Sequence, residues 1–383
     1  MGLRPHSLFG TLLKTSSSEQ AWSPRGVRRV QAGQWRCPQS GCRGKGPMSE
    51  MTMSDDFGAT GVTRGGAPAP LVRLFGWTML AALAAFLINN VLVVSYDLPG
   101  VRGLWSGQAG AAWPNLAVLA VAVLLAWGIV LRNSARTTLR ADAHRIHRFN
   151  CYLIRAAFWA VLLVGVGDFL IALARVENLF FFLGEDQIRN LAKPIWVGTY
   201  IHMPLVVVAF VIALFTRTLG FHWLALLIVT AELGIVISRF GFSYEQALMG
   251  DLVRYWYAAL FLFAAAFTLY EDGHVRVDVL YAGFGPTTKG MVNAFGSIIL
   301  GMATAWVILY IGLNGKQSII NSPVLNFEVT QSGQTGMYVK YQMAAFLGVF
   351  ASTMLIQFVS FFFEAWADWR GEPGKREIAP AAH

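Results

Sequence analysis

The ionisable side chains that lie inside long apolar stretches are the residues of this sequence best placed to do chemistry. Asp168 and His202 each lie in such a stretch, and Glu232 and Arg239 share another. Because a charge inside a bilayer is expensive, such residues serve either in ion or proton relays or in polar contacts between helices. Glu232 and Arg239 are seven residues apart, so they lie on one helical face, two turns from each other. A relay needs clustered acids or interrupted helices in matching positions, and both are absent from the sequence, so we favour polar contacts.

Histidine and cysteine show no catalytic or metal-binding pattern. A diheme cytochrome b subunit needs paired histidines on facing membrane helices, and only His202 of the seven histidines lies well within an apolar stretch. His144 and His147 fall in an Arg-rich connection, where we interpret them as a solvated helical face. The three cysteines have no further ligands that complete a zinc site. We find no phosphate-binding loop, zinc-protease helix or nucleophile elbow, and we expect no catalytic residue, cofactor or bound metal.

The composition is that of a membrane protein. Of the 383 residues, 55% are hydrophobic and 13% are charged, whereas soluble domains have about 25% charged residues. The formal charge of +9 is concentrated in residues 1–47, which carry eight Lys and Arg residues and one acid, Glu19. We expect residues 1–66 to be a disordered basic leader, partly upstream of the true start, and we infer no nucleic-acid partner from its charge.

Eight windows of the sequence are apolar enough to cross a bilayer as helices. A helix of roughly 20 residues spans the ~30 Å hydrocarbon core. None of the windows alternates as a membrane β-strand does, so the sequence predicts an all-α polytopic membrane protein. The predicted spans are 71–95, 113–131, 151–174, 195–216, 221–240, 252–270, 290–313 and 340–363.

The Lys and Arg residues of the connections predict the orientation, because they favour the cytoplasmic side. The connection 132–150 carries five Arg residues and only Asp142 as an acid, whereas 175–194 is balanced. We therefore place 132–150 in the cytoplasm, and an even number of spans places both termini there. The spacing of the spans predicts an additional four-helix block, a second four-helix domain and a cytoplasmic tail, at 67–220, 221–370 and 371–383.

Three polar segments of the second domain are suited to contacts. Residues 243–256 begin with Ser243, a good helix-capping residue, and mix charges with aromatic residues, which predicts an interfacial helix. In residues 271–278, Asp272-Gly273 interrupts the helix, and from His274 onward polar side chains alternate with valines, so one side of the turn is polar and the other aliphatic. The connection from Lys316 to Lys340 is the longest on the predicted outer side, and we expect a docking surface there.

Two of these segments carry a family resemblance. They contain Arg239-Phe240-Gly241 followed by Glu245, and then Glu271-Asp272-Gly273-His274-Val275-Arg276-Val277-Asp278-Val279-Leu280-Tyr281. This pattern resembles the small membrane subunit of tripartite ATP-independent periplasmic (TRAP) transporters, the DctQ-like family. That family typically has Arg and Tyr or Phe at the end of its first span, an acidic interfacial helix, and a Gly-His-hydrophobic-Arg-Val-Asp turn after its second. The resemblance covers about residues 219–365.

The resemblance implies a scaffold subunit in a bacterial inner membrane. Its implied partners are a large permease subunit, which moves the solute, and a periplasmic binding protein, which captures it. Uptake of a solute in the class of organic acids would be coupled to an ion gradient, commonly of sodium, with the ion bound by the large subunit. The block 67–220 is additional to the four spans of the family, and we expect it to enlarge the surface that faces lipid or partners.

We therefore expect a membrane scaffold without enzymatic activity. Two alternatives from other classes remain at this point: a stand-alone secondary transporter, and the membrane anchor of a redox enzyme. The residues that we expect to contact other subunits or to anchor helices are Glu232, Arg239, Glu245, His274, Arg276 and Asp278.

Overall fold

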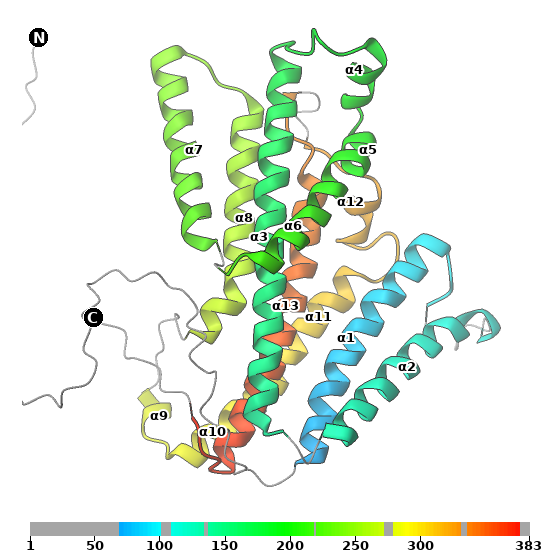
Figure 1. Ribbon diagram of the computed structural model, residues 1–383, viewed down its shortest axis with the longest axis vertical. Coiled ribbons are helices and arrows are strands. Elements are labelled where there is room, and N and C mark those ends of the chain that lie inside the picture. The colour runs from blue at the N-terminus through cyan, green and yellow to red at the C-terminus, as the bar shows by residue number, and fades with distance from the viewer. Residues whose placement is uncertain are drawn as a thin grey trace, which may run out of the picture. The chain divides into compact units, whose positions relative to one another are not determined.

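The computed structural model describes residues 69–100, 109–133, 137–217, 220–271, 279–330 and 335–375 (Figure 1). These residues form helices and no strand, and eight of the helices are long and apolar enough to cross a membrane. The predicted all-α membrane fold is therefore confirmed. The leader 1–66 lies outside the described residues, as do the turn residues His274, Arg276 and Asp278.

Six spans are single helices, and two contain a π-helical turn. The single helices are α1 (Pro70–Tyr96), α2 (Ala109–Asn133), α3 (Leu139–Val176), α7 (Phe221–Phe242), α8 (Ala247–Tyr270) and α13 (Lys340–Trp369). The fourth span consists of α5 (Pro194–Val197), η2 (Gly198–His202) and α6 (Met203–Phe215), and the seventh of α10 (Pro286–Gly296), η3 (Ser297–Met302) and α11 (Ala303–Gly312). Short helices outside the spans are α4 (Glu185–Leu191), α9 (Val279–Ala282) and α12 (Asn321–Leu325).

Helix α3 begins well before the predicted start of the third span. We predicted a connection over 132–150, but the helix starts at Leu139, where the Thr138 hydroxyl accepts a hydrogen bond from the Ala141 N–H at 3.2 Å. Such a side-chain cap satisfies one of the free amides of the first turn. The following residues include no Gly or Pro, so the helix runs without interruption into the apolar stretch. Hydropathy detects only the apolar part of a helix, the part that contacts lipid. The polar first turns of α3 were therefore assigned to the connection, and the predicted start of the helix was wrong.

The predicted interfacial helix over 243–256 is also wrong in its boundary. Ser243 does not cap the start of a helix, because it is the C-cap residue of α7, with a positive φ of 50°. Gln246 is extended, and α8 then runs unbroken from Ala247 to Tyr270. Ser243 instead contributes to a tight reversal between two antiparallel spans, which a left-handed residue at a helix end makes possible.

Helices α3 and α13 form the centre of the helical assembly. Helix α3 contacts α6, α8 and α13, and α13 also contacts α1, α10 and α11. One hydrophobic cluster joins Leu83 and Ile146 to Leu355 and Phe362, and a second joins Ile154 to Phe263. The helices before and after residue 220 therefore share their hydrophobic interior, which positions the polar groups described next.

Candidate functional site

Asp168 and His202, the two buried ionisable residues that the sequence singled out, meet inside the protein. The Nε2 atom of His202 lies 3.3 Å from Oδ1 of Asp168, and both side chains are fully buried. Asp168 comes from α3 and His202 from the last residue of η2. A π-helical turn widens the helix locally and often occurs at functional sites. Here it lies where the imidazole enters the interior.

Both residues are also bonded to the segment around the start of α13. The Tyr338 backbone N–H donates to Oδ2 of Asp168 at 2.6 Å, and the Tyr341 hydroxyl lies 2.9 Å from Nδ1 of His202. The Gln342 amide donates to the Tyr341 hydroxyl at 3.0 Å, and the Tyr255 hydroxyl of α8 donates to the Gln342 side chain. We call this chain of contacts from Asp168 to Tyr255 the polar junction.

Two further charged residues, Arg175 and Asp251, bind the segment 335–339 next to the polar junction. Arg175 stacks over the Tyr338 ring at 4.0 Å and donates to the Gly336 carbonyl at 3.3 Å. Asp251 accepts the Met337 N–H at 3.1 Å. Burial raises the pKa of the Tyr338 phenol above its usual value, against the opposing effect of nearby Arg175. Met337, Tyr338 and Val339 are buried, so this end of the predicted docking loop is interior rather than free surface.

A second row of polar contacts joins α3 to α13. His147 Nδ1 lies 3.0 Å from Oε1 of Gln357, and its ring stacks on Tyr270 with centroids 3.4 Å apart. Asn150 donates to the Thr353 carbonyl at 3.0 Å. His147 is 3% exposed, so its predicted placement on a solvated face is wrong. Because α3 continues through the predicted connection, the side of the helix that bears His147 faces α13.

Of the predicted contact residues in α7 and just after it, Arg239 and Glu245 form an ion pair and Glu232 does not. Arg239 Nε lies 3.4 Å from Oε2 of Glu245, and both side chains are more than half exposed. Glu232 is exposed as well, and within the described part of the chain it has no ion-pair partner. Glu232 and Arg239 therefore do not pair with each other, because the Arg239 guanidinium pairs with Glu245 beside the α7–α8 reversal.

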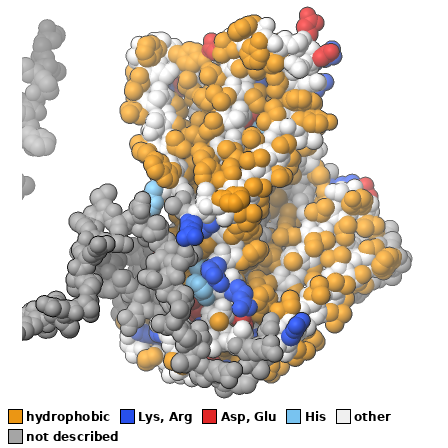
Figure 2. All heavy atoms as spheres, viewed as in Figure 1, with side chains coloured by type: hydrophobic (Ala, Val, Ile, Leu, Met, Phe, Trp, Pro, Cys, Tyr) orange, Lys and Arg blue, Asp and Glu red, His pale blue; other side chains and the backbone are white. Residues whose placement is uncertain are grey.

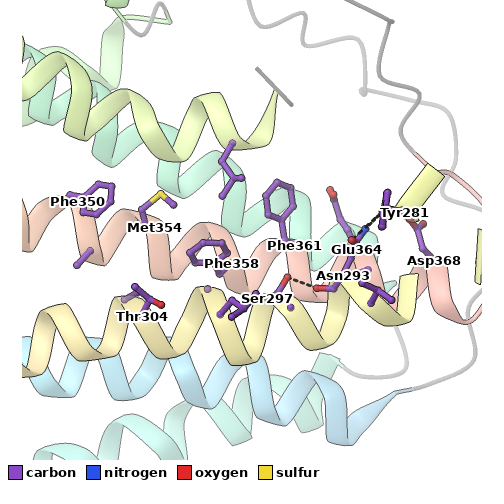
Figure 3. A pocket seen from close by; sticks show the side chains of 18 of the residues that line it. Tyr281, Asn293, Ser297, Thr304, Phe350, Met354, Phe358, Phe361, Glu364 and Asp368 are labelled. Carbon is purple, nitrogen blue, oxygen red and sulfur yellow. Dashed lines mark hydrogen bonds between the residues drawn. The ribbon is translucent and has the colours of Figure 1, made fainter. Parts of the chain in front are cut away.

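A half-open groove of about 700 Å³ lies between α13 and the seventh span (Figure 3). Its apolar walls include Leu300, Ile308 and Met354. At one end the groove becomes polar: Arg140 bonds Asp368 at 2.7 Å, and Lys375 lies 3.6 Å from the same carboxylate. An apolar surface that ends in mixed charges can accommodate a lipid chain below its headgroup.

One comparison with known proteins decides the family of the second half. The family model for the DctQ component of tripartite ATP-independent periplasmic transporters matches residues 225–368. Those residues belong to the DctQ family. The match runs from α7 into α13, so it covers the last four of the eight spans. The curated proteins and the solved structures that were searched contain no match to the chain.

Some residues of the polar junction lie within the DctQ match and others precede it in the sequence. Tyr255, Tyr338, Tyr341 and Gln342 are within the matched residues, whereas Asp168 and His202 precede them. Sequence reasoning missed these four residues. Tyr338, Tyr341 and Gln342 lie just before or within the first turn of the last apolar window, and that cluster of polar residues was a signal for them, whereas Tyr255 in α8 gave none. The family is a transporter component and not a family of enzymes. The junction is an arrangement that fixes the relative positions of four helices.

Proposed function

We propose that this chain is the small permease subunit of a TRAP transporter and acts as a scaffold for uptake driven by an ion gradient. The observation that carries the proposal is the DctQ match over residues 225–368. The partners that follow from it are a large permease subunit and a periplasmic solute-binding protein. The proposed solute is an organic acid, and the proposed coupling ion is sodium, bound by the large subunit.

The geometry of the interior supports a scaffold role. Asp168 and His202 are engaged with each other and with the segment at the start of α13. Buried polar side chains with partners on more than one helix serve to position those helices. If the helices shift, a contact breaks and a buried polar atom is left without a partner, which is unfavourable. We propose that the block 67–220 enlarges and stiffens this scaffold. We further propose that the chain resides in the inner membrane with both termini in the cytoplasm, in contact with membrane lipid.

The partner proposal is tested by purifying the chain with an affinity tag from its native membranes and identifying the proteins that elute with it. We expect a large TRAP permease subunit in a fixed ratio to this chain. Elution of the chain without such a subunit, from membranes that contain it, would contradict the proposal. A matched preparation in which the tag is on an unrelated inner-membrane protein controls for carry-over.

A further inference from the structure

Helix α7 is the span that the rest of the chain covers least. Only 6% of its most apolar window is buried, against 17–56% in the other seven spans. Its packing contacts are mainly with α8, which lies beside it (Figure 1), and Leu224 is the one buried residue of this helix. The remaining sides expose large apolar residues, among them Val229, Leu233 and Phe240. Figure 2 shows hydrophobic side chains over the visible face of this helix. In a membrane, these sides contact either lipid or another protein.

A single carboxylate lies in the middle of this exposed helix. Glu232 is close to the midpoint of Phe221–Phe242, so it lies ~16 Å along the axis from the first residue, near the middle of a ~30 Å hydrocarbon core. Arg239 does not neutralise it, because that guanidinium is paired with Glu245 at 3.4 Å. An exposed carboxylate at this depth is unfavourable against acyl chains, which offer no hydrogen-bond donor.

The residues around Glu232 have the spacing of a helix-packing seam. Ala225, Val229, Glu232, Val236 and Arg239 follow one another at intervals of four, three, four and three residues. This alternation keeps one stripe facing a neighbouring helix over several turns. Val229 is 64% exposed and Val236 is 49% exposed, so no described part of the chain fills the seam around the carboxylate. We call these five residues the α7 seam.

We propose that the α7 seam docks a transmembrane helix of the large permease subunit that presents Lys or Arg at the depth of Glu232. This inference rests on the proposed function and specifies the face and the chemistry of the contact. Charge complementarity selects the occupant: the carboxylate needs a cation, and branched apolar residues flank it on both sides.

A second copy of this chain does not meet the same requirement. Two copies in one membrane share an orientation, so a symmetric contact through the α7 seam places the two Glu232 carboxylates side by side. Like charges at that position repel, and the nearest cation of the seam, Arg239, is about 10 Å away along the axis. Lipid satisfies the apolar part of the seam and leaves the carboxylate without a partner.

The first test measures how much large subunit is purified with variants of the tagged chain. We expect Glu232→Gln to reduce the yield of large subunit about tenfold, the effect of one lost ion-paired contact. The double variant Glu232→Thr with Thr230→Glu keeps the composition of the helix but moves the carboxylate ~160° around it, and we expect an equal loss. Thr230→Val, on that other side, is the matched control and should keep the wild-type yield.

The second test locates the contact in a chain that retains Glu232. A photoreactive phenylalanine derivative placed at Val229 or Val236 should attach to the large subunit. The same group at Ile237, which is 51% exposed on another side of α7, should attach mainly to lipid. Restored binding of Glu232→Lys by a Lys→Glu or Arg→Glu change in the attached helix would identify the paired cation.

The outcomes separate this inference from the proposed function. If the wild-type chain does not purify with the large subunit, both are contradicted. If the wild-type complex forms but Glu232→Gln retains the full yield, and the groups at Val229 and Val236 attach to lipid or to a second copy, only the α7 seam is contradicted.

Discussion

The carboxylate of Asp168 holds the backbone N–H of Tyr338 at 2.6 Å. Asp168 belongs to α3, which precedes the DctQ match, and Tyr338 lies inside the match, just before its last helix. A main-chain group at the entrance to a DctQ span is therefore satisfied by a side chain from the additional block. Because a buried N–H without a partner is unfavourable, the two parts of the chain depend on each other for their local structure.

Asp168→Ala should destabilise the protein strongly. The change removes both the acceptor of the Tyr338 N–H and the partner of His202. Removing one member of a buried pair lowers the free energy of unfolding by about 3–5 kcal/mol. Asp168→Asn should be milder, since its amide oxygen can still accept from Tyr338. Reversible unfolding in mixed detergent micelles measures both differences.

Asp186→Ala is the matched control for this change. Asp186 pairs with Arg189 at 2.6 Å, but its side chain is 85% exposed. A surface pair contributes about 0–1 kcal/mol, so the control should unfold almost as the wild type does. Equal stability of Asp168→Ala and Asp186→Ala would show that the polar junction does not stabilise the fold.

Tyr341→Phe should weaken the contact between the fourth span and α13. The hydroxyl lies 2.9 Å from Nδ1 of His202 and accepts from Gln342 at 3.0 Å. Its loss leaves buried partners unsatisfied, and we expect the free energy of unfolding to fall by about 1–3 kcal/mol. Tyr257→Phe is the control, because that ring is exposed on α8. An undiminished stability of Tyr341→Phe, in the same unfolding assay, would argue against the bonded arrangement.

Gly290→Ala should disturb the contact between α10 and α13. A Cβ at this position lies 2.4 Å from the Trp369 nitrogen and 2.9 Å from the Ala365 carbonyl oxygen, both of which are main-chain atoms. Since main chain cannot rotate away, the helices must separate, at a cost of about 1–3 kcal/mol. Gly296→Ala, in the same helix, meets no atom within 4 Å and should leave the melting temperature unchanged or raise it. Equal melting temperatures for the two variants would refute this close approach.

Residues 221–383 should fold poorly without the preceding block. Helix α3 fills the space beside α8 and α13 and bonds Asp368, Thr353 and Tyr338. Expressed alone, the fragment exposes these surfaces, and we expect it to be degraded in the membrane. Co-expression with residues 67–220 should restore its level, as seen by immunoblotting of membranes. A stable fragment that also binds the large subunit unaided would contradict the proposed role of the added block.

The spans could be predicted from sequence because the bilayer requires long apolar stretches. Each of the eight predicted windows lies within a spanning helix of the described residues or runs past its end by one residue. Pro70, Pro194 and Pro286 begin three of these spans, as proline favours the first helical turn. The start of α3 could not be located in the same way. Its first turns bury Asp142 and His147 against protein rather than lipid, so hydropathy gives no signal there.

The members of the polar junction could be found in part, but their pairing could not. Asp168 and His202 were conspicuous because they interrupt apolar stretches. Tyr341 and Gln342 resemble ordinary residues near a membrane surface, where Tyr is common. Which of these groups meet depends on how α3, η2 and α13 are packed. Ser243 shows the same limit on a smaller scale: its residue type suits a helix start, and the tertiary reversal placed it at a helix end.

Solute uptake into vesicles tests the central proposal most directly. The chain is reconstituted alone, with the large permease subunit, and with the large subunit plus the binding protein, and radiolabelled organic acids are supplied outside under an inward sodium gradient. We predict uptake only when all three proteins are present, and none by this chain alone at any gradient. Accumulation of solute by vesicles that contain this chain as their sole protein would contradict the scaffold account.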